Sequence, residues 1–159
     1  TTGLRFFTVY GPYGRPDMAL FKFVKAIKEG QPIQIFNHGN MTRDFTYIDD
    51  IVEAIFRLQN IPPVTKLDEV KLTPNTSSAP YKVFNIGNGN PVNLMDFIDE
   101  IESYLNISAI KDFLPMQDGD VQNTEADTSD LYQMIDFKPK TNIKDGLKNF
   151  LDWYEDYYS

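Results

Sequence analysis

Arginine is the side chain in this sequence best suited to bind an anionic ligand, and two of the four arginines stand in informative positions. Arg43 opens the run Arg43-Asp44-Phe45-Thr46-Tyr47-Ile48-Asp49-Asp50, in which a short apolar segment precedes two aspartates. A guanidinium on an extended segment that is braced by a following helix can bind a phosphate or a carboxylate through two parallel hydrogen bonds. Arg43 is therefore a candidate anion ligand, and the alternative is a structural Arg–Asp ion pair.

Three further polar residues lie in predicted loops. Arg15 lies in a loop rich in glycine and proline, residues 11–17, directly after an apolar segment, where α/β proteins bind ligands. The alternative is a solvated arginine in a surface turn. Asp120 could accept hydrogen bonds from paired sugar hydroxyls, or it is only a turn residue. His38 is predicted to be a turn residue, because the sequence fixes no acid or nucleophile beside it.

The composition excludes several classes of site and partner. The 159 residues include no cysteine and one histidine, which excludes disulfides and thiolate or histidine-rich metal sites. The net charge of −8 disfavours a nucleic-acid binder, which needs a basic patch. No apolar run approaches the roughly 20 residues of a membrane span and no signal peptide is visible, so we expect a cytoplasmic protein. The G-x-G at Gly87 is only a weak signal for a phosphate loop.

Hydrophobic periodicity predicts an α/β domain that positions these residues. The apolar segment 4–10 is typical of a strand buried on both faces in a parallel sheet. Further strands are expected at residues 33–36, 45–48, 82–87 and 110–114. Helices with one apolar face are expected at residues 18–29, 50–59, 93–105, 126–135 and 142–158. Because a domain rarely opens on such a strand, we expect its sheet partners to lie outside this chain, which would then be a fragment.

Turn and cap residues set the ends of these elements. Side chains that can accept the first free N–H groups of a helix stand at each expected start, namely Asp17, Asp49 or Asp50, Asn93, and Thr141 or Asn142. Residues 37–40 are predicted to form a hairpin-like turn. Residues 61–80 are rich in Pro, Thr, Ser and Asn and are expected to form an exposed excursion.

Several runs resemble the NAD-dependent epimerase/dehydratase family of extended short-chain dehydrogenase/reductases, most of all its UDP-glucuronate 4-epimerase branch. They are Leu4-Arg5-Phe6-Phe7-Thr8-Val9-Tyr10-Gly11-Pro12, Arg15-Pro16-Asp17-Met18-Ala19, Asn37-His38-Gly39, residues 43–50, Asn85-Ile86-Gly87-Asn88, Leu114-Pro115-Met116-Gln117, Gly119-Asp120-Val121 and Ala126-Asp127-Thr128. The resemblance covers nearly the whole chain. It implies that residues 1–159 form a single sugar-nucleotide-binding domain, the carboxyl-terminal half of a Rossmann-type enzyme with a remnant strand of its parallel sheet.

The resemblance also implies a reaction. Hydride passes from sugar C4 to NAD, the 4-keto intermediate rotates, and hydride returns to the opposite face, which interconverts UDP-glucuronate and UDP-galacturonate. The family's G-x-x-G-x-x-G loop and Tyr-x-x-x-Lys pair are not in this sequence, since the fourth residue after Tyr10 is Gly14. NAD would therefore be held mainly by the missing half, no catalytic residue would lie in this chain, and the chain alone would be inactive. The complete enzyme is expected to be a homodimer.

The resemblance assigns ligand contacts to eleven residues. The UDP-sugar would be contacted by Thr8, Arg15, Met18, Ala19, Gln34, Phe36, Arg43, Gln117 and Asp120. The nicotinamide of the cofactor would be lined by Tyr10 and Pro12, with Thr8 beside them. Gln117 stands where some relatives have a second phosphate-binding arginine.

Within this set the roles differ. Arg43 would bind the diphosphate, Asp120 the ribose hydroxyls, and Arg15 the uronate carboxylate. Gln34 and Phe36 resemble the uracil-binding strand.

Two other functions fit the same residues. One is a module that binds sugar nucleotides without turnover, and the other is a nucleotide-sugar dehydratase or a 4-epimerase for neutral sugars. Exposed apolar surface around residues 4–9 would favour a fragment, because that strand would lack its sheet partners.

Overall fold

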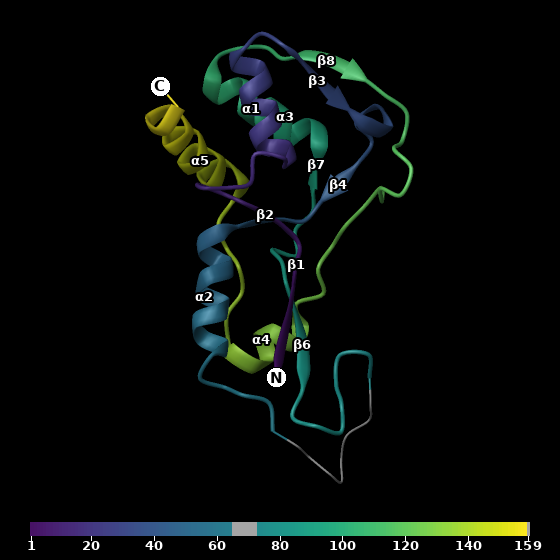
Figure 1. The fold of residues 1–159 in the computed structure, drawn as a ribbon, viewed down its shortest axis with the longest axis vertical. Coiled ribbons are helices and arrows are strands. Elements are labelled where there is room, and N and C mark those ends of the chain that lie inside the picture. The colour runs from purple at the N-terminus through teal and green to yellow at the C-terminus, as the bar shows by residue number, and fades with distance from the viewer. Residues whose placement is uncertain (65–72, 159) are drawn as a thin grey trace.

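The structure is a computed structural model that describes residues 1–64 and 73–158, and its elements form two lobes along the long axis (Figure 1). The lobe with the chain's C-terminus contains α1 (Ala19–Lys28), α3 (Leu94–Leu105), α5 (Ile143–Tyr158), β3 (Pro32–Ile35) and β8 (Ile110–Phe113). The lobe with the N-terminus contains β1 (Thr2–Phe6), β6 (Lys82–Ile86), α2 (Ile48–Leu58) and α4 (Ser129–Ile135). The remaining short elements are η1 (Phe36–Gly39), which follows β3 in the lobe with the C-terminus, and β2 (Thr8–Tyr10), β4 (Thr42–Arg43), β5 (Phe45–Tyr47) and β7 (Val92–Asn93), which lie toward the junction of the lobes (Figure 1).

Four strand pairs make up the sheet structure of the described residues. Three pairs are parallel, β1 with β6, β2 with β5 and β3 with β8, and β4 pairs antiparallel with β7. The predicted single strand at residues 4–10 is instead two strands that change partner at Phe7. The Phe7 N–H donates to the Ile86 carbonyl at 3.1 Å, and the Thr8 N–H donates to the Asp44 carbonyl at 3.1 Å.

Within the described residues, the segment 4–10 is not buried on both faces, and its exposed apolar surface is what we expect of a fragment. Only Tyr10 is fully buried, and Phe6 is exposed over about half of its surface. An apolar run indicates burial but not what covers each face, and in this chain one face of β1 has no cover.

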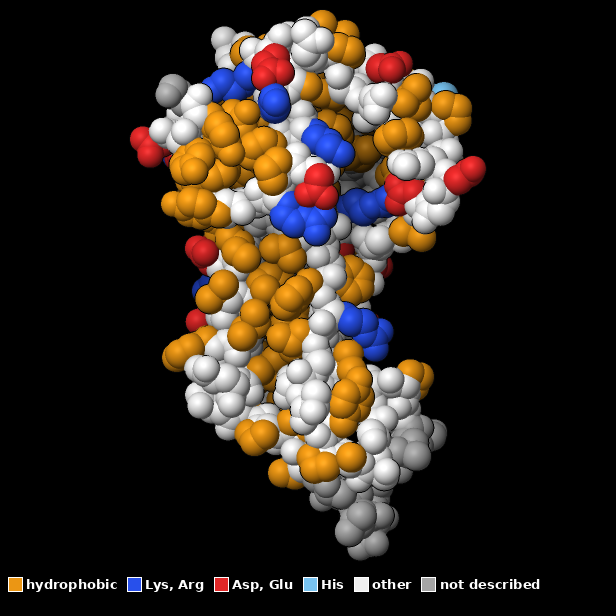
Figure 2. All heavy atoms as spheres, in the orientation of Figure 1, with side chains coloured by type: hydrophobic (Ala, Val, Ile, Leu, Met, Phe, Trp, Pro, Cys, Tyr) orange, Lys and Arg blue, Asp and Glu red, His pale blue; other side chains and the backbone are white. Residues whose placement is uncertain are grey.

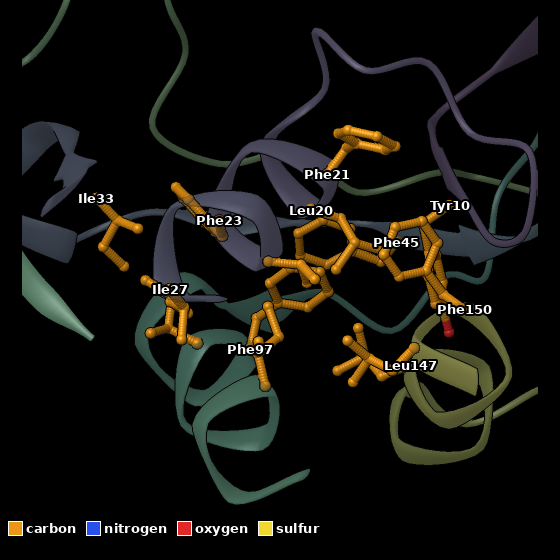
Figure 3. Close-up of a cluster of buried hydrophobic side chains, with 14 of the residues drawn as sticks. Tyr10, Leu20, Phe21, Phe23, Ile27, Ile33, Phe45, Phe97, Leu147 and Phe150 are labelled. Carbon is orange, nitrogen blue, oxygen red and sulfur yellow. The ribbon is translucent and has the colours of Figure 1, made fainter. Parts of the chain in front are cut away.

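Each lobe has its own hydrophobic core. In the lobe that contains α1, α3 and α5, aromatic rings dominate, and the Phe45 ring stacks on the Phe97 ring with centroids 4.1 Å apart (Figure 3). In the other lobe, one face of α2 packs with β6 and α4 through Ile51, Ala54, Leu58, Phe84, Ile86, Leu131 and Ile135. The segment from β1 to β2 contributes to both cores, since Tyr10 lies in the first and Leu4 and Val9 pack on the second.

Two of the predicted helix caps are confirmed. The Asn93 side chain accepts a hydrogen bond from the Met95 N–H at 2.8 Å, and the Asn142 side chain accepts one from the Asp145 N–H at 2.9 Å. Both oxygens therefore satisfy N–H groups that a helix leaves unpaired at its start.

The predicted caps at Asp17, Asp49 and Asp50 were wrong. Helix α1 follows Met18 and α2 follows Tyr47, and neither helix start has a side-chain cap. The two aspartates of α2 lie in its first turn, where their charge suits the helix dipole. The helix starts before them at apolar Ile48, which packs against the core of the other lobe, and the polar start signal does not reveal this.

The turn at residues 37–40 is not a hairpin. Strand β3 pairs with β8, which comes much later in the chain, and the residues after it form the short helix η1. Asn37 and His38 adopt left-handed backbone angles, with φ of 50° and 51°. His38 is thus a turn residue, as predicted. Of the predicted excursion at 61–80, residues 65–72 lie outside the described residues.

Candidate functional site

A cleft of about 220 Å³ lies where β2, α1, β3 and β4 meet. Its lining combines one arginine, one aspartate, an amide and several apolar side chains: Thr8, Met18, Ala19, Phe23, Gln34, Phe36, Met41, Arg43, Phe45, Leu94 and Asp120. A neighbouring hollow of about 470 Å³ shares part of this wall and is also lined by Lys22 and Asp112. The fold thereby brings together seven of the nine residues predicted to contact a UDP-sugar, which come from five separate stretches of chain.

Arg43 is held rigidly at one end of the cleft. Its Nη1 donates to the carbonyls of Thr42 at 2.9 Å and Gln122 at 3.0 Å, and its Nη2 donates to Asp120 Oδ1 at 2.9 Å. Only 16% of the side chain is exposed. A guanidinium has five N–H donors, so Nε and the second hydrogen of Nη2 remain without a partner among the described residues. The structural ion pair and the anion site are therefore compatible.

Asp120 sits at the tip of a tight turn beside Arg43. Its N–H donates to the Gln117 carbonyl at 3.2 Å, and Gly119 has the positive φ of 81° that such a turn favours. Asp120 Oδ1 accepts from Arg43 and from the Val121 N–H at 2.8 Å. Its other carboxylate oxygen is left for a ligand hydroxyl. The Gln117 side chain is exposed and does not line the cleft.

The opposite end of the cleft is apolar and aromatic. Phe36 and Phe23 lie there beside the exposed amide of Gln34. An aromatic ring next to an amide can stack on a planar heterocycle while the amide hydrogen-bonds its edge. The cleft thus offers an apolar, base-sized surface at one end and a positive charge at the other.

Comparison with known proteins finds a matching family model and similar proteins. Residues 1–66 match the model of the NAD dependent epimerase/dehydratase family. Over 99% of its length the chain is 58% identical to Protein CapI of Staphylococcus aureus, covering 48% of that protein. It is 48% identical to a probable UDP-glucuronate 4-epimerase of Rhizobium meliloti, covering 47% of it. Over residues 1–66 the chain is thus similar to the NAD dependent epimerase/dehydratase family.

The solved structures of this family share the fold. A UDP-glucuronic acid 4-epimerase from Bacillus cereus, solved in complex with UDP-glucuronic acid and NAD, superposes with a TM-score of 0.80 at 34% identity. The match covers 96% of this chain and 44% of that one. The chain therefore has the α/β fold of a Rossmann-type epimerase, as predicted, and spans about half the length of the relatives it matches.

Arg15, for which the family resemblance predicted a contact to the uronate, lies outside the cleft. Its Nε and Nη2 bind the two carboxylate oxygens of Asp17 at 3.0 and 2.7 Å, and 73% of the side chain is exposed. The hydrogen bond from Arg15 lowers the pKa of the Asp17 carboxyl. Arg15 Nη2 also approaches the sulfur of Met18, a cleft residue, at 3.6 Å. Arg15 is thus next to the cleft but turned toward its own loop.

Tyr10 and Pro12, for which a cofactor contact was predicted, do not line the cleft either. The Tyr10 ring is buried among Phe45, Tyr47 and Phe97 (Figure 3), and its hydroxyl has no hydrogen-bond partner within residues 1–64 and 73–158. Burial, aided by the nearby acid Asp50, raises the pKa of that hydroxyl. Only the backbone of Tyr10 is left to meet a cofactor. Pro12 is half-buried in the loop that Tyr13 anchors by its ring contact with Trp153.

Sequence reasoning missed four cleft residues, Phe23, Met41, Phe45 and Leu94. All four are also buried, and an apolar residue type indicates burial but carries no signal for a second, ligand-facing side. The search for metal sites found no suitable cluster of acidic or histidine side chains among residues 1–64 and 73–158. Likewise, no helix in the described part of the chain is long and apolar enough to cross a membrane.

Proposed function

We propose that this chain is the sugar-nucleotide-binding half of an NAD-dependent UDP-uronate 4-epimerase. The observation that carries the proposal is the cleft itself, in which the Arg43–Asp120 pair faces an aromatic surface with an amide at its edge. Its support from outside the chain is the epimerase family and the neighbour that binds UDP-glucuronic acid.

In this proposal each end of the cleft binds one part of the ligand. The free donors of Arg43 bind the diphosphate, and the free oxygen of Asp120 accepts a ribose hydroxyl. Phe36 stacks on the uracil, and Gln34 hydrogen-bonds its edge. The two backbone carbonyls and one carboxylate that hold Arg43 in place lower the entropy lost on binding, so the sugar is presented to the rest of the enzyme in one orientation.

The residues of this chain do not form a complete NAD site. The sequence has no glycine-rich dinucleotide loop and no Tyr-x-x-x-Lys pair, and the Tyr10 side chain lies in the core. We therefore propose that NAD is bound mainly by the part of the protein outside residues 1–159. A homodimer, a cytoplasmic location and the inactivity of the chain alone remain predictions.

A 4-epimerase or dehydratase for neutral sugars is the second candidate. Its support is the position of Arg15, which pairs with Asp17 and leaves the cleft without a cation dedicated to a uronate carboxylate. Epimerisation of UDP-glucuronate by the complete natural protein, measured against UDP-glucose, decides between the two.

The first test replaces Arg43 in the complete natural protein. Arg43→Met keeps the length of the side chain and removes the charge, so the affinity for UDP should fall about 10- to 100-fold, the effect of losing charge-assisted hydrogen bonds. Arg57→Met is the matched control, because Arg57 pairs with Glu53 on α2 at 2.6 Å and lies outside the cleft. Titration calorimetry with UDP measures both. Equal affinities of the two variants would contradict the proposed site.

A further inference from the structure

Asp44, the residue after Arg43, is fully buried, yet it pairs with no lysine or arginine among the described residues. Its carboxylate accepts backbone N–H groups instead. Oδ1 accepts from Asn88 at 2.8 Å, and Oδ2 accepts from Gly89 at 2.9 Å and from Ala126 at 2.9 Å. One side chain thus binds two segments that are far apart in the sequence, the turn before β7 and the segment before α4.

Both of these segments flank Arg43. On one side the turn at Asn88 and Gly89 leads into β7, where Val92 pairs with Arg43 itself. On the other side the segment that ends at Ala126 carries Gln122 and Asp120, which both accept hydrogen bonds from the guanidinium.

The second segment is fixed along its whole length. The Thr42 N–H donates to the Gln122 carbonyl at 3.0 Å, and the Thr124 N–H donates to the Thr42 carbonyl at 3.2 Å. The Asp44 N–H donates to Thr124 Oγ1 at 3.1 Å. Asp44 completes this series of hydrogen bonds, since its backbone N–H and its carboxylate both bind the segment.

The geometry around the carboxylate leaves little freedom. A Cβ at Gly87 would lie 2.3 Å from the Ala126 Cβ and 3.0 Å from Asp44 Oδ2. The two segments therefore meet over Asp44 at a distance that only a glycine permits. Loss of one hydrogen-bond acceptor on Asp44 would therefore disturb the contact between the two segments.

We propose that Asp44 is a positioning residue of the nucleotide site. Its carboxylate holds the two segments that flank Arg43, and so it sets the direction of the guanidinium and the place of Asp120. The inference rests on the proposed function in one respect only, that the anion bound by Arg43 is the diphosphate of a nucleotide.

The experiment is a double-mutant cycle in the complete natural protein. Asp44→Asn replaces one acceptor by a donor that faces backbone N–H groups, and UDP affinity should fall at least about 10-fold. In the Arg43→Met background the same change should lower UDP affinity by no more than about 2-fold, because the effects of substitutions at residues that act through one another are not additive. Asp50→Asn is the matched control. Asp50 is also buried and accepts the Thr141 N–H at 3.0 Å, but it is not bound to either segment beside Arg43.

Amide hydrogen exchange supplies a readout that needs no ligand. The N–H groups of Gly89 and Ala126 should exchange faster in Asp44→Asn and unchanged in Asp50→Asn. If wild-type protein binds no UDP, the proposed function fails, and exchange alone then tests whether Asp44 holds the two segments.

Two results would overturn the inference: an equal loss of UDP affinity in the Arg43 and Arg43→Met backgrounds, or unchanged exchange at Ala126. Should Asp44→Asn fail to fold, Thr124→Val decides, since it removes the oxygen that accepts the Asp44 N–H and spares the buried carboxylate. Its effect on UDP affinity should be smaller and should also vanish in the Arg43→Met background. An effect that persists there would contradict the inference.

Discussion

Arg43 and Arg15 differ in how far their surroundings already fix them. Arg43 is mostly buried and donates to two carbonyls and one carboxylate, so a ligand meets a guanidinium that hardly has to move. Arg15 is mostly exposed, and its pair with Asp17 has to be exchanged for any ligand carboxylate. An exposed pair of this kind is weak, so the exchange costs little.

Replacing Arg15 and Asp17 separately tests whether Arg15 selects uronates. If it does, Arg15→Ala in the complete protein should lower the affinity for UDP-glucuronate on the order of 10-fold and leave that for UDP-glucose unchanged. Asp17→Asn should act in the opposite direction, because it releases the guanidinium. Lys22→Ala is the control, since Lys22 is a nearby cation that lines the neighbouring hollow. An unchanged ratio of the two affinities in Arg15→Ala would refute the uronate role.

Sequence motifs predicted several residues of the candidate site, but they did not predict the direction in which each side chain points. The resemblance placed residues such as Arg43 and Asp120 correctly in one cleft, because the family's pattern fixes where they fall in the fold. It could not show that the Tyr10 side chain points into the core. That direction follows from the break at Phe7, which depends on partners from β5 and β6.

At the scale of elements, the helices were predicted within a few residues because each has one apolar face, whereas the strand pairs were not. Strand β8 shows why. Ile110 and Phe113 are both exposed, so its sequence has no buried side that would identify its partner. A polar contact fixes it instead. Glu102 of α3 accepts from the Ala109 N–H at 2.6 Å and from Lys111 Nζ at 2.8 and 2.7 Å. This contact supports β3 and, through it, the Gln34 wall of the cleft.

This contact should make the stability of the β8 region depend on pH. Burial raises the pKa of Glu102, but the hydrogen bonds from Lys111 and the Ala109 N–H outweigh it and lower the pKa below the usual 4.5. A carboxyl whose folded pKa is lowered stabilises the fold above its unfolded pKa, and this contribution is lost as the pH falls through the folded value.

Glu102→Gln measures the contribution. The variant should lose about 1–3 kcal/mol of unfolding free energy at about pH 7, because Lys111 keeps its charge and is left with only the more distant Asp99, 4.0 Å away, as a partner of opposite charge. At about pH 3 the difference from wild type should shrink. Glu100→Gln on the same helix, where no ion pair is present among the described residues, should match wild type at both pH values. Thermal unfolding at the two pH values is the measurement, and a difference that grows at low pH would contradict this account.

At the scale of the whole molecule, the lobe with the N-terminus has an apolar face that the described residues leave uncovered. Helix α2 buries one side on β6 and α4 but exposes Val52, Ile55 and Phe56 on another, and Phe6 of β1 adds to them. Figure 2 shows this hydrophobic surface along α2 and β1. Parallel sheets are normally covered on both faces, and the chain spans about half the length of its relatives. We expect the rest of the protein to cover this face.

Phe56 is a suitable position for testing whether another part of the protein covers this face, because 62% of the residue is exposed in this chain. Phe56→Asp should lower the melting temperature of the complete protein by several degrees, since a charge would then be buried. In residues 1–159 alone it should instead reduce self-association. Ile107→Asp, a change at another exposed apolar residue, should do neither. Melting curves and analytical ultracentrifugation give the two readouts, and a complete protein that tolerates both changes equally would argue against a covered face.

The change of partner at Phe7 has a consequence for how this segment can vary among relatives. Strand β1 pairs with β6 in a register that places Phe6 opposite Ile86. Strand β2 pairs with β5 in a register that places Thr8 opposite Phe45, and one residue separates the two strands. An inserted or deleted residue could keep one register only by reversing the alternation of the other, which would turn Tyr10 away from the core. The number of residues from 2 to 10 is therefore constrained, and an alignment gap inside this segment would signal a different arrangement of the two lobes.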